Sequence, residues 1–305
     1  MICYSRCFRQ KFSMKFKQKK NILGYIEAHP KPSKEFLENF YKNIYFKKKV
    51  TKSFSNSYSQ EEFKNKTVRA KFEISFIKKK LRKNNIKFLE IGSGEGFILN
   101  EASKQKGWKI IGVDFNNFGM KFNKKMLKNF LQINPDTFLE NSIAKKLKFD
   151  VIVLNNVLEH VINPKILMRQ IYKITNKSSV ILVSVPNDYS FLQLSAIKKK
   201  FFSKPPWFQP PQHLSYFNTT NIKNFFKKNN FKIIDSVSNF PIEFFLFLKF
   251  SFFYNNPLKG KEAYKARIFL ENLIYQKNFD EAYSFFNSCA KLGFGRNFST
   301  LIKKR

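Results

Sequence analysis

The feature that most constrains the fold is a short apolar run that ends in three glycines at alternate positions. In the stretch FLEIGSGEGF, residues 88–97, the glycines are Gly92, Gly94 and Gly96, and a segment of helical spacing follows. Glycine is favoured where the backbone turns sharply or passes close to a ligand, because a Cβ atom would collide there. Position 97 is Phe, so the dinucleotide-binding pattern GxGxxG is not satisfied. The stretch predicts a buried strand, a tight turn that approaches a ligand, and a helix.

Short apolar runs alternate with segments of helical spacing through most of the chain. The runs are rich in β-branched residues or phenylalanine, as is typical of strands buried on both faces of a sheet. Such alternation predicts an α/β fold that is Rossmann-like and doubly wound, with a mainly parallel sheet, and a helical insertion is expected near the C-terminus. The expected strands are 86–91, 109–113, 130–133, 150–154, 180–185 and 231–237, and the expected helices are 61–83, 97–106, 119–128, 164–175 and 219–230.

Periodicity and proline content divide the chain into parts. Residues 1–60 show no clean period and are expected to form a basic arm followed by short helices. Residues 61–239 are expected to form the cofactor-binding domain, in which 186–218 is a proline-rich insertion over the carboxyl ends of the strands, where ligands bind in such sheets. Residues 240–292 are expected to form a helical lid on the side where a second substrate, the acceptor, would bind. Residues 293–305 are expected to form a final strand and tail.

A carboxylate follows the second expected strand. Asp114 comes directly after the run KIIGV, so in a parallel sheet it lies at the same edge as the glycine turn. A carboxylate in this place can accept hydrogen bonds from both hydroxyls of a ribose. A strand, a glycine turn, a helix, a second strand and an acid in this order predict a nucleoside-binding site.

Several segments are together typical of one enzyme superfamily. EIGSGEG followed by GVDF resembles the first motifs of class I S-adenosylmethionine-dependent methyltransferases, and FDVIVLNNVLEHVINP is similar to their fourth-strand motif. SVPNDYS, PPQHLSYFN and the segment from NFPIEFFLFL to GFGRN are similar to a bacterial subgroup often linked to polysaccharide and other small-molecule pathways. The resemblance runs from about Thr67 to the C-terminus. It implies a methyltransferase with S-adenosylmethionine as its cofactor.

The resemblance also implies roles for individual positions. The glycine turn would pass under the methionine part of the cofactor, and Asp114 would hold its ribose. Asp136 follows the third expected strand, where relatives usually place an acid near the adenine amine, although NPD here replaces the common GD. Asn155 and Asn156 would lie beside the methyl-donor pocket. The cofactor-binding residues expected on this basis are Glu90, Gly92, Ser93, Gly94, Gly96, Asp114, Phe115, Asp136, Asn155 and Asn156.

Two of the three histidines are catalytic candidates. Methyl transfer from a sulfonium is an in-line displacement, and a hydroxyl or ammonium acceptor must also lose a proton to a base. His160 lies in VLEH near the expected cofactor pocket, and His213 lies in the proline-rich insertion. Each of them could instead brace its own loop through a hydrogen bond. His29 lies in a region without other signals and is expected to be simply exposed.

Cysteine and histidine spacing gives no sign of a metal site. Cys3, Cys7 and Cys289 form no CxxC pair and have no nearby histidine at metal-ligand spacing. No cluster of histidines and carboxylates stands out either, so we expect no metal. The cysteine pattern favours a reducing, cytoplasmic setting. No apolar stretch reaches the ~20 residues that a membrane span needs, and the basic N-terminus is compatible with either an arm or a targeting segment.

The net charge leaves more than one class of partner open. A formal charge of +36, from 57 Lys and Arg against 21 Asp and Glu, would attract nucleic acid. Lys, Asn, Phe and Ile are abundant together while Arg is scarce, as AT-rich codons produce, so we interpret the charge as codon bias. The resemblance to the bacterial subgroup implies a small-molecule acceptor, such as a sugar or nucleotide-linked sugar. An RNA methyltransferase that uses the basic surface, and a non-catalytic cofactor-fold module, are the alternatives.

Overall fold

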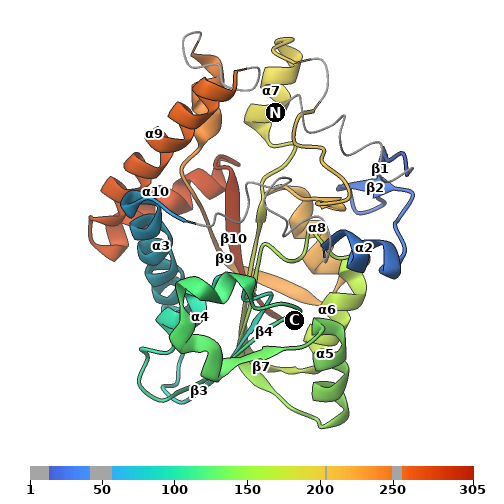
Figure 1. Cartoon of the computed structure of the whole chain (residues 1–305), viewed down its shortest axis with the longest axis vertical. Coiled ribbons are helices and arrows are strands. Elements are labelled where there is room, and N and C mark those ends of the chain that lie inside the picture. The colour runs from blue at the N-terminus through green and yellow to red at the C-terminus, as the bar shows by residue number, and fades with distance from the viewer. Residues whose placement is uncertain (1–13, 42–56, 203–204, 249–255) are drawn as a thin grey trace.

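A seven-stranded sheet forms the centre of the molecule. The computed structural model describes residues 14–41, 57–202, 205–248 and 256–305. The strand order is β5-β4-β3-β6-β7-β10-β9 (Figure 1), and β10 is the one strand of this sheet that runs opposite to the other six. The strands are β3 (Ile86–Ile91), β4 (Trp108–Asp114), β5 (Phe130–Gln132), β6 (Phe149–Asn155), β7 (Thr175–Pro186), β9 (Phe231–Ser238) and β10 (Asn297–Lys304). The prediction of a Rossmann-like, mainly parallel sheet is confirmed.

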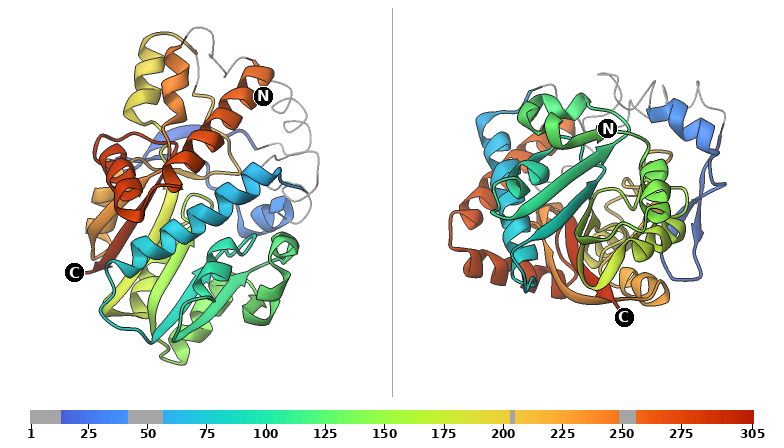
Figure 2. Two further views of the ribbon diagram at one scale, coloured as in Figure 1. Left: turned by 90° about the vertical axis from the view of Figure 1, so that its left-hand side faces the viewer. Right: turned by 90° about the horizontal axis from the view of Figure 1, so that it is seen from below.

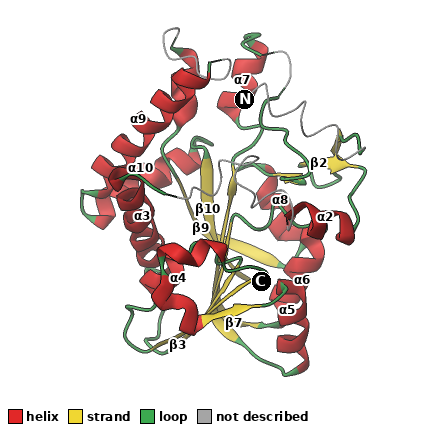
Figure 3. Cartoon of the chain, in the orientation of Figure 1, coloured by secondary structure: helices red, strands yellow, loops and turns green. Residues whose placement is uncertain are grey.

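Helices cover both faces of this sheet, as Figure 2 and Figure 3 show. One hydrophobic core joins the sheet to α3, α4 and α10, and a second joins it to α5, α6 and α8. Because both faces are covered, β6 is buried along its length except for its last residue. The helices of the two layers are α3 (Gln60–Lys78), α4 (Phe97–Ala102), α5 (Pro135–Ala144), α6 (Pro164–Lys173), α8 (Asn221–Lys228) and α10 (Phe279–Lys291).

The segment after β4 differs from the single helix expected at 119–128. It forms two 3₁₀ helices, η2 (Phe118–Phe122) and η3 (Lys124–Asn129). This segment packs closely on the glycine turn, since a Cβ atom at Gly119 would lie 2.4 Å from the carbonyl oxygen of Gly94. Helix α5 was not among the expected helices; Asn134 caps it by accepting a hydrogen bond from the backbone N–H of Asp136.

The N-terminal part contains strands that the sequence did not indicate. β1 (Lys17–Lys20) and β2 (Ile26–His29) form an antiparallel pair, and β2 also pairs with β8 (Ser215–Tyr216) of the proline-rich insertion. Helix α2 (Lys34–Phe40) follows. The rest of the expected basic arm, 1–13 and 42–56, lies outside the described residues. The small sheet connects the start of the chain to the insertion above the main sheet.

The region after β9 is helical, as expected. It contains η4 (Ile242–Phe247) and α9 (Pro257–Tyr275) before α10, and 249–255 lie outside the described residues. The side-chain amide of Asn65 in α3 donates to Glu271 and Asn272 of α9, at 3.1 and 3.0 Å. Helix α7 (Phe191–Lys198) lies beside η4. None of the described helices combines the length and apolar character that crossing a membrane requires.

Candidate active site

The glycine turn after β3 has a left-handed backbone at all three glycines. The φ angles are 69° at Gly92, 50° at Gly94 and 71° at Gly96. A Cβ atom would lie 2.5 Å from Val157 Cγ2 at Gly92, and 2.8 Å from Met120 Sδ at Gly96. Close approach to the protein itself therefore requires glycine at positions 92 and 96.

Asp114 lies at the end of β4 and faces this turn. Its Oδ2 accepts a hydrogen bond from the backbone N–H of Gly94 at 3.0 Å, and its Oδ1 one from Asn116 at 3.3 Å. The side chain is buried, which raises the pKa of the carboxyl, and the backbone N–H groups offset part of that effect. The parallel strands thus bring the acid and the turn together, as the sequence predicts.

Glu90 and Ser93 lie beneath the turn and are both buried. Burial raises the pKa of the Glu90 carboxyl well above its usual range, and the nearby carboxylates of Glu73 and Asp114 raise it further. The Oε2 atom of Glu90 has no hydrogen-bond partner among the described residues. The hydroxyl of Ser93 donates to the carbonyl oxygen of Glu90 at 3.1 Å, so its contact is internal to the turn.

The remaining cofactor candidates occupy the same edge of the sheet but differ in their surroundings. Phe115 is 42% exposed. Asp136 is exposed in the first turn of α5, where a negative charge also favours the helix N-terminus. Asn156 has a left-handed backbone, accepts a hydrogen bond from the Asn297 amide at 2.8 Å and donates to Asn155 at 3.3 Å. The Asn156 side chain is thus already engaged by β10.

The structure brings His160 and His213 together. His160 lies in the loop after β6 and His213 shortly before β8, and their ring centroids are 4.9 Å apart. Glu159 is 1% exposed, and its Oε1 lies 3.8 Å from His160 Nε2. Asp188 Oδ2 lies 3.9 Å from His213 Nδ1. His29, by contrast, is exposed at the end of β2, as expected.

The histidine cluster, consisting of Glu159, His160 and His213, is a feature that the sequence did not indicate. One ligand atom from each residue lies within 4.8 Å of the other two, which is close enough to hold a metal ion. The sequence does not reveal the cluster because α6, β7 and α7 separate His213 from the other two residues.

Burial controls the charge state of this region. It lowers the pKa of His160 to about 3, with a further contribution from His213, and it lowers the pKa of His213 to about 3, with a further contribution from Arg296. Both imidazoles are therefore neutral near pH 7. Burial raises the pKa of Glu159 to about 8 and also raises the pKa of Asp188. Arg296 opposes this effect at Asp188, since its Nη1 lies 2.7 Å from Asp188 Oδ1.

Tyr41, directly after α2, connects the histidine cluster to Phe115, and the sequence did not indicate it. Its hydroxyl lies 3.0 Å from His160 Nδ1 and donates to the carbonyl oxygen of Gln212 at 3.3 Å. Its ring makes an edge contact with Phe115, with centroids 5.8 Å apart. Asp188 and Arg296 were also missed. The apolar spacing of Leu37, Phe40 and Tyr41 is a weak helical signal, and nothing local indicates their distant partners.

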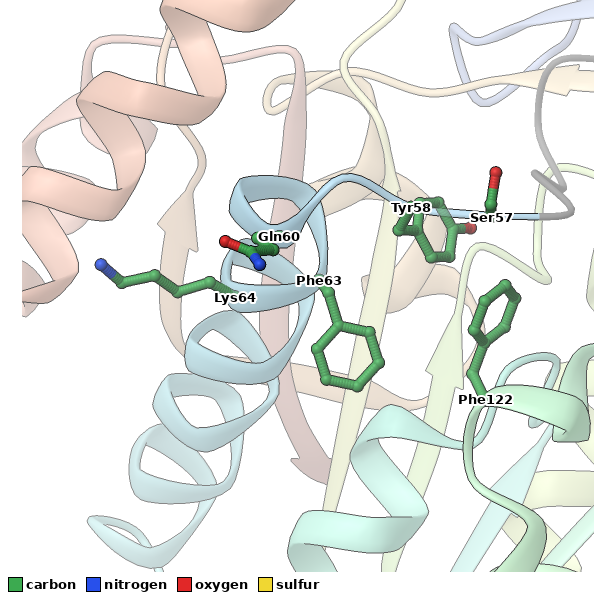
Figure 4. Close-up of a pocket in the computed structure, with 6 residues that line it drawn as sticks. All are labelled: Ser57, Tyr58, Gln60, Phe63, Lys64 and Phe122. Atoms are coloured by element: carbon green, nitrogen blue, oxygen red, sulfur yellow. The ribbon is translucent and has the colours of Figure 1, made fainter.

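A surface hollow lies on the other side of the glycine turn (Figure 4). The Tyr58 hydroxyl donates to Glu95 within the turn, and Lys66 forms an ion pair with Glu95 at 2.7 Å. The rings of Tyr58 and Phe122 pack with centroids 4.7 Å apart. None of the predicted site residues lines the hollow, whose lining residues are Ser57, Tyr58, Gln60, Phe63, Lys64 and Phe122.

Residues 62–236 match a protein family described as "Methyltransferase domain". The chain is 30% identical over 106 residues to a ubiquinone biosynthesis O-methyltransferase of Pelagibacter ubique, covering 34% of this chain and 43% of that protein. It is 26% identical over 158 residues to the protein of the same name from Bartonella quintana, covering 50% of this chain and 63% of that one. A solved S-adenosylmethionine-dependent methyltransferase from Archaeoglobus fulgidus is 18% identical, with 78% of this chain and 92% of that chain covered and a TM-score of 0.47. The chain spans between 12% and 63% of the lengths of the curated relatives it matches.

Proposed function

The chain belongs to the methyltransferase-domain family, as its sequence motifs suggested, and from this premise we propose that it transfers a methyl group from S-adenosylmethionine to a small-molecule acceptor. The observation that carries this proposal is the hydrogen bond between the Asp114 carboxylate and the backbone N–H of Gly94. It fixes an acid beside a bare backbone turn at the carboxyl edge of a parallel sheet, where nucleosides bind.

Each part of the cofactor has a suitable partner at this edge. The carboxylate of Asp114 has lone pairs beyond those that Gly94 and Asn116 use, and these can accept from ribose hydroxyls. Phe115 offers an exposed aromatic ring for the adenine. The buried carboxyl group of Glu90 lies beneath the turn, and its Oε2 atom has no hydrogen-bond partner among the described residues, so it can accept a hydrogen bond from the ammonium group of the methionine part.

For the acceptor we propose a hydroxyl oxygen. Both curated O-methyltransferase relatives carry that chemistry in their names. A sugar or nucleotide-linked sugar, the acceptor expected from the sequence, presents hydroxyls as well. We place the acceptor beside the histidine cluster, because the ring of Tyr41 contacts both His160 and Phe115, with centroids 6.2 and 5.8 Å apart. We keep a cytoplasmic location as a prediction from the cysteine pattern.

In the proposed reaction the acceptor oxygen attacks the methyl carbon in line with the carbon–sulfur bond. The oxygen–carbon bond forms, the sulfur keeps the electron pair of the broken bond, and S-adenosylhomocysteine and one proton are released. His160 and His213 are neutral near pH 7 because burial lowers the pKa of each to about 3, so neither repels the sulfonium. We propose that both are needed for loss of the hydroxyl proton.

The test is isothermal titration with S-adenosylmethionine followed by a labelled-methyl screen over nucleotide sugars, phenols and RNA. Asp114→Ala should weaken cofactor binding about 10- to 100-fold, as expected for charged hydrogen bonds to the ribose. Asp280→Ala is the matched control, because Asp280 is exposed in the first turn of α10. His160→Ala or His213→Ala should lower turnover with little change in cofactor affinity.

Equal affinity of the Asp114→Ala variant and the wild type would contradict the proposed cofactor site. Methyl incorporation into RNA, with binding that weakens steeply with salt, would favour the nucleic-acid alternative. A chain that binds no S-adenosylmethionine at all would favour the non-catalytic module.

A further inference from the structure

The histidine cluster has the donor set of a metal site. Glu159 offers a carboxylate oxygen, and His160 and His213 each offer an imidazole nitrogen, all within 4.8 Å of one another. Two imidazoles and one carboxylate suit Zn²⁺ and similar first-row divalent cations, whereas Mg²⁺ and Ca²⁺ prefer oxygen ligands alone. Three protein ligands also leave a coordination position open for a water molecule or a substrate oxygen.

Glu159 supplies an independent observation that points to a cation. Its side chain is 1% exposed, and neither carboxylate oxygen has a hydrogen-bond partner among the described residues. The loop is nevertheless firmly held, since the Glu159 carbonyl oxygen accepts from the backbone N–H groups of Leu214 and Ser215 at 2.8 and 3.2 Å. A buried carboxyl group that makes no hydrogen bond is costly, and a bound cation would give its oxygens a partner.

The surroundings orient His160 as a ligand. Its Nδ1 lies 2.6 Å from the carbonyl oxygen of Gln212, which can only accept, so Nδ1 carries the proton. The lone pair is then on Nε2, the atom that lies 3.8 Å from Glu159 Oε1. A backbone carbonyl that fixes the tautomer of a metal-binding histidine is a recurrent feature of such sites.

A second carboxylate supports the other histidine. Asp188 Oδ2 lies 3.9 Å from His213 Nδ1, and Arg296 holds the other oxygen of Asp188 at 2.7 Å. Carboxylates often take this place behind a metal-binding imidazole. The side chains of His160 and His213 are 19% and 16% exposed, so a cation and a substrate oxygen can reach their outer edge.

We propose that Glu159, His160 and His213 bind a divalent cation of the zinc type, whose open position takes the hydroxyl oxygen of the acceptor. The second half of this proposal rests on the proposed function. The cation lowers the pKa of the bound hydroxyl, whose proton leaves to water. The resulting oxygen anion attacks the methyl carbon, and the carbon–sulfur bond breaks toward sulfur. The histidines thus promote deprotonation as ligands, and the acceptor class is an alcohol or a phenol.

The first experiment uses the metal alone and needs no acceptor. The full chain is treated with chelator, dialysed and titrated with Zn²⁺, and Co²⁺ is added in parallel because its visible spectrum reports the ligand set. We expect one tight site per chain. Glu159→Gln and His213→Ala should each weaken it by at least the roughly 100-fold that an outer-shell change can cost. His29→Ala, which removes an exposed imidazole, should leave it unchanged.

Two results would overturn the site. In one, Zn²⁺ binds the His29→Ala variant as weakly as it binds the cluster variants. In the other, Zn²⁺ binds the wild type no more tightly than it binds the cluster variants. His160→Gln provides a second variant if Glu159→Gln does not fold. Titration with S-adenosylmethionine on the same metal-free protein separates the two proposals. If the cofactor binds and the cation does not, the metal site falls and the methyltransferase stands. If the cation binds and the cofactor does not, the proposed function falls.

Discussion

The two halves of the candidate site are constructed in different ways. The half that we propose for the cofactor comes from residues that are close in sequence: the glycine turn lies directly after β3, and Asp114 ends the neighbouring parallel strand β4. The acceptor half is assembled from Tyr41, the loop after β6, the proline-rich insertion and Arg296 before β10. The first half depends on backbone conformation, and the second on buried charges and hydrogen bonds between distant segments. Substitutions in the two halves should therefore differ in how they change stability and ligand binding.

The largest expected effect is in the acceptor half, at Arg296. Its guanidinium is the partner of Asp188, whose side chain is 1% exposed, and Glu243 and Glu159 lie nearby. Arg296→Met removes the positive charge from beside these buried acids, so the free energy of unfolding should fall by about 3–5 kcal/mol. Urea denaturation measures the change. Lys79→Met, which breaks a more exposed ion pair with Asp280, should cost at most about 1 kcal/mol. Equal losses in the two variants would contradict this account of the acceptor half.

In the cofactor half, two glycines of one turn should separate stability from binding. Gly92→Ala combines a left-handed φ with a contact of 2.5 Å to Val157, so it should destabilise the fold by about 2–4 kcal/mol. At Gly94 the left-handed φ of 50° is the strain that the structure shows, so Gly94→Ala should cost about 1 kcal/mol. Its methyl group would nevertheless face the ligand, so titration should show cofactor affinity reduced at least 10-fold. Full affinity in the Gly94→Ala variant would mean that the cofactor does not pass over this residue.

The same contrast explains what the sequence could predict. The strands of the main sheet, the glycine turn and Asp114 depend on local apolar runs and short spacing, and their expected positions agree with the structure within a few residues at most ends. The pairing of β2 with β8 could not be predicted, because those strands lie far apart in the chain and are only four and two residues long. The contact of Glu159 with His213 could not be predicted for the same reason, because the two residues lie far apart in the chain. The close approach of Gly119 to the Gly94 carbonyl was not predictable either, because no local pattern indicates it.

Tyr41 links the two halves, and two substitutions should separate its contacts. Tyr41→Phe removes the hydroxyl from His160 and from the Gln212 carbonyl but keeps the ring beside Phe115. One lost hydrogen bond of about 1 kcal/mol predicts turnover about 3- to 10-fold lower with unchanged cofactor affinity. Tyr41→Ala also loses the ring contact, so cofactor affinity should fall by a similar factor. If titration and steady-state kinetics show the two variants to be identical, the ring does not support the cofactor half.

The smallest expected effect tests Asp136, whose assignment remains a prediction. It is exposed in the first turn of α5, and an acid there contributes about 0.3–1 kcal/mol to helix stability whether or not it touches a ligand. Stability therefore cannot decide its role, and a cofactor analogue that lacks the adenine amine can. If Asp136 accepts from that amine, the wild type should bind the analogue about 3- to 10-fold more weakly than S-adenosylmethionine, and Asp136→Ala should remove the difference. Glu140→Ala, at an exposed acid on the same helix, should keep the difference. If the discrimination persists in the Asp136→Ala variant, Asp136 acts only at the helix N-terminus.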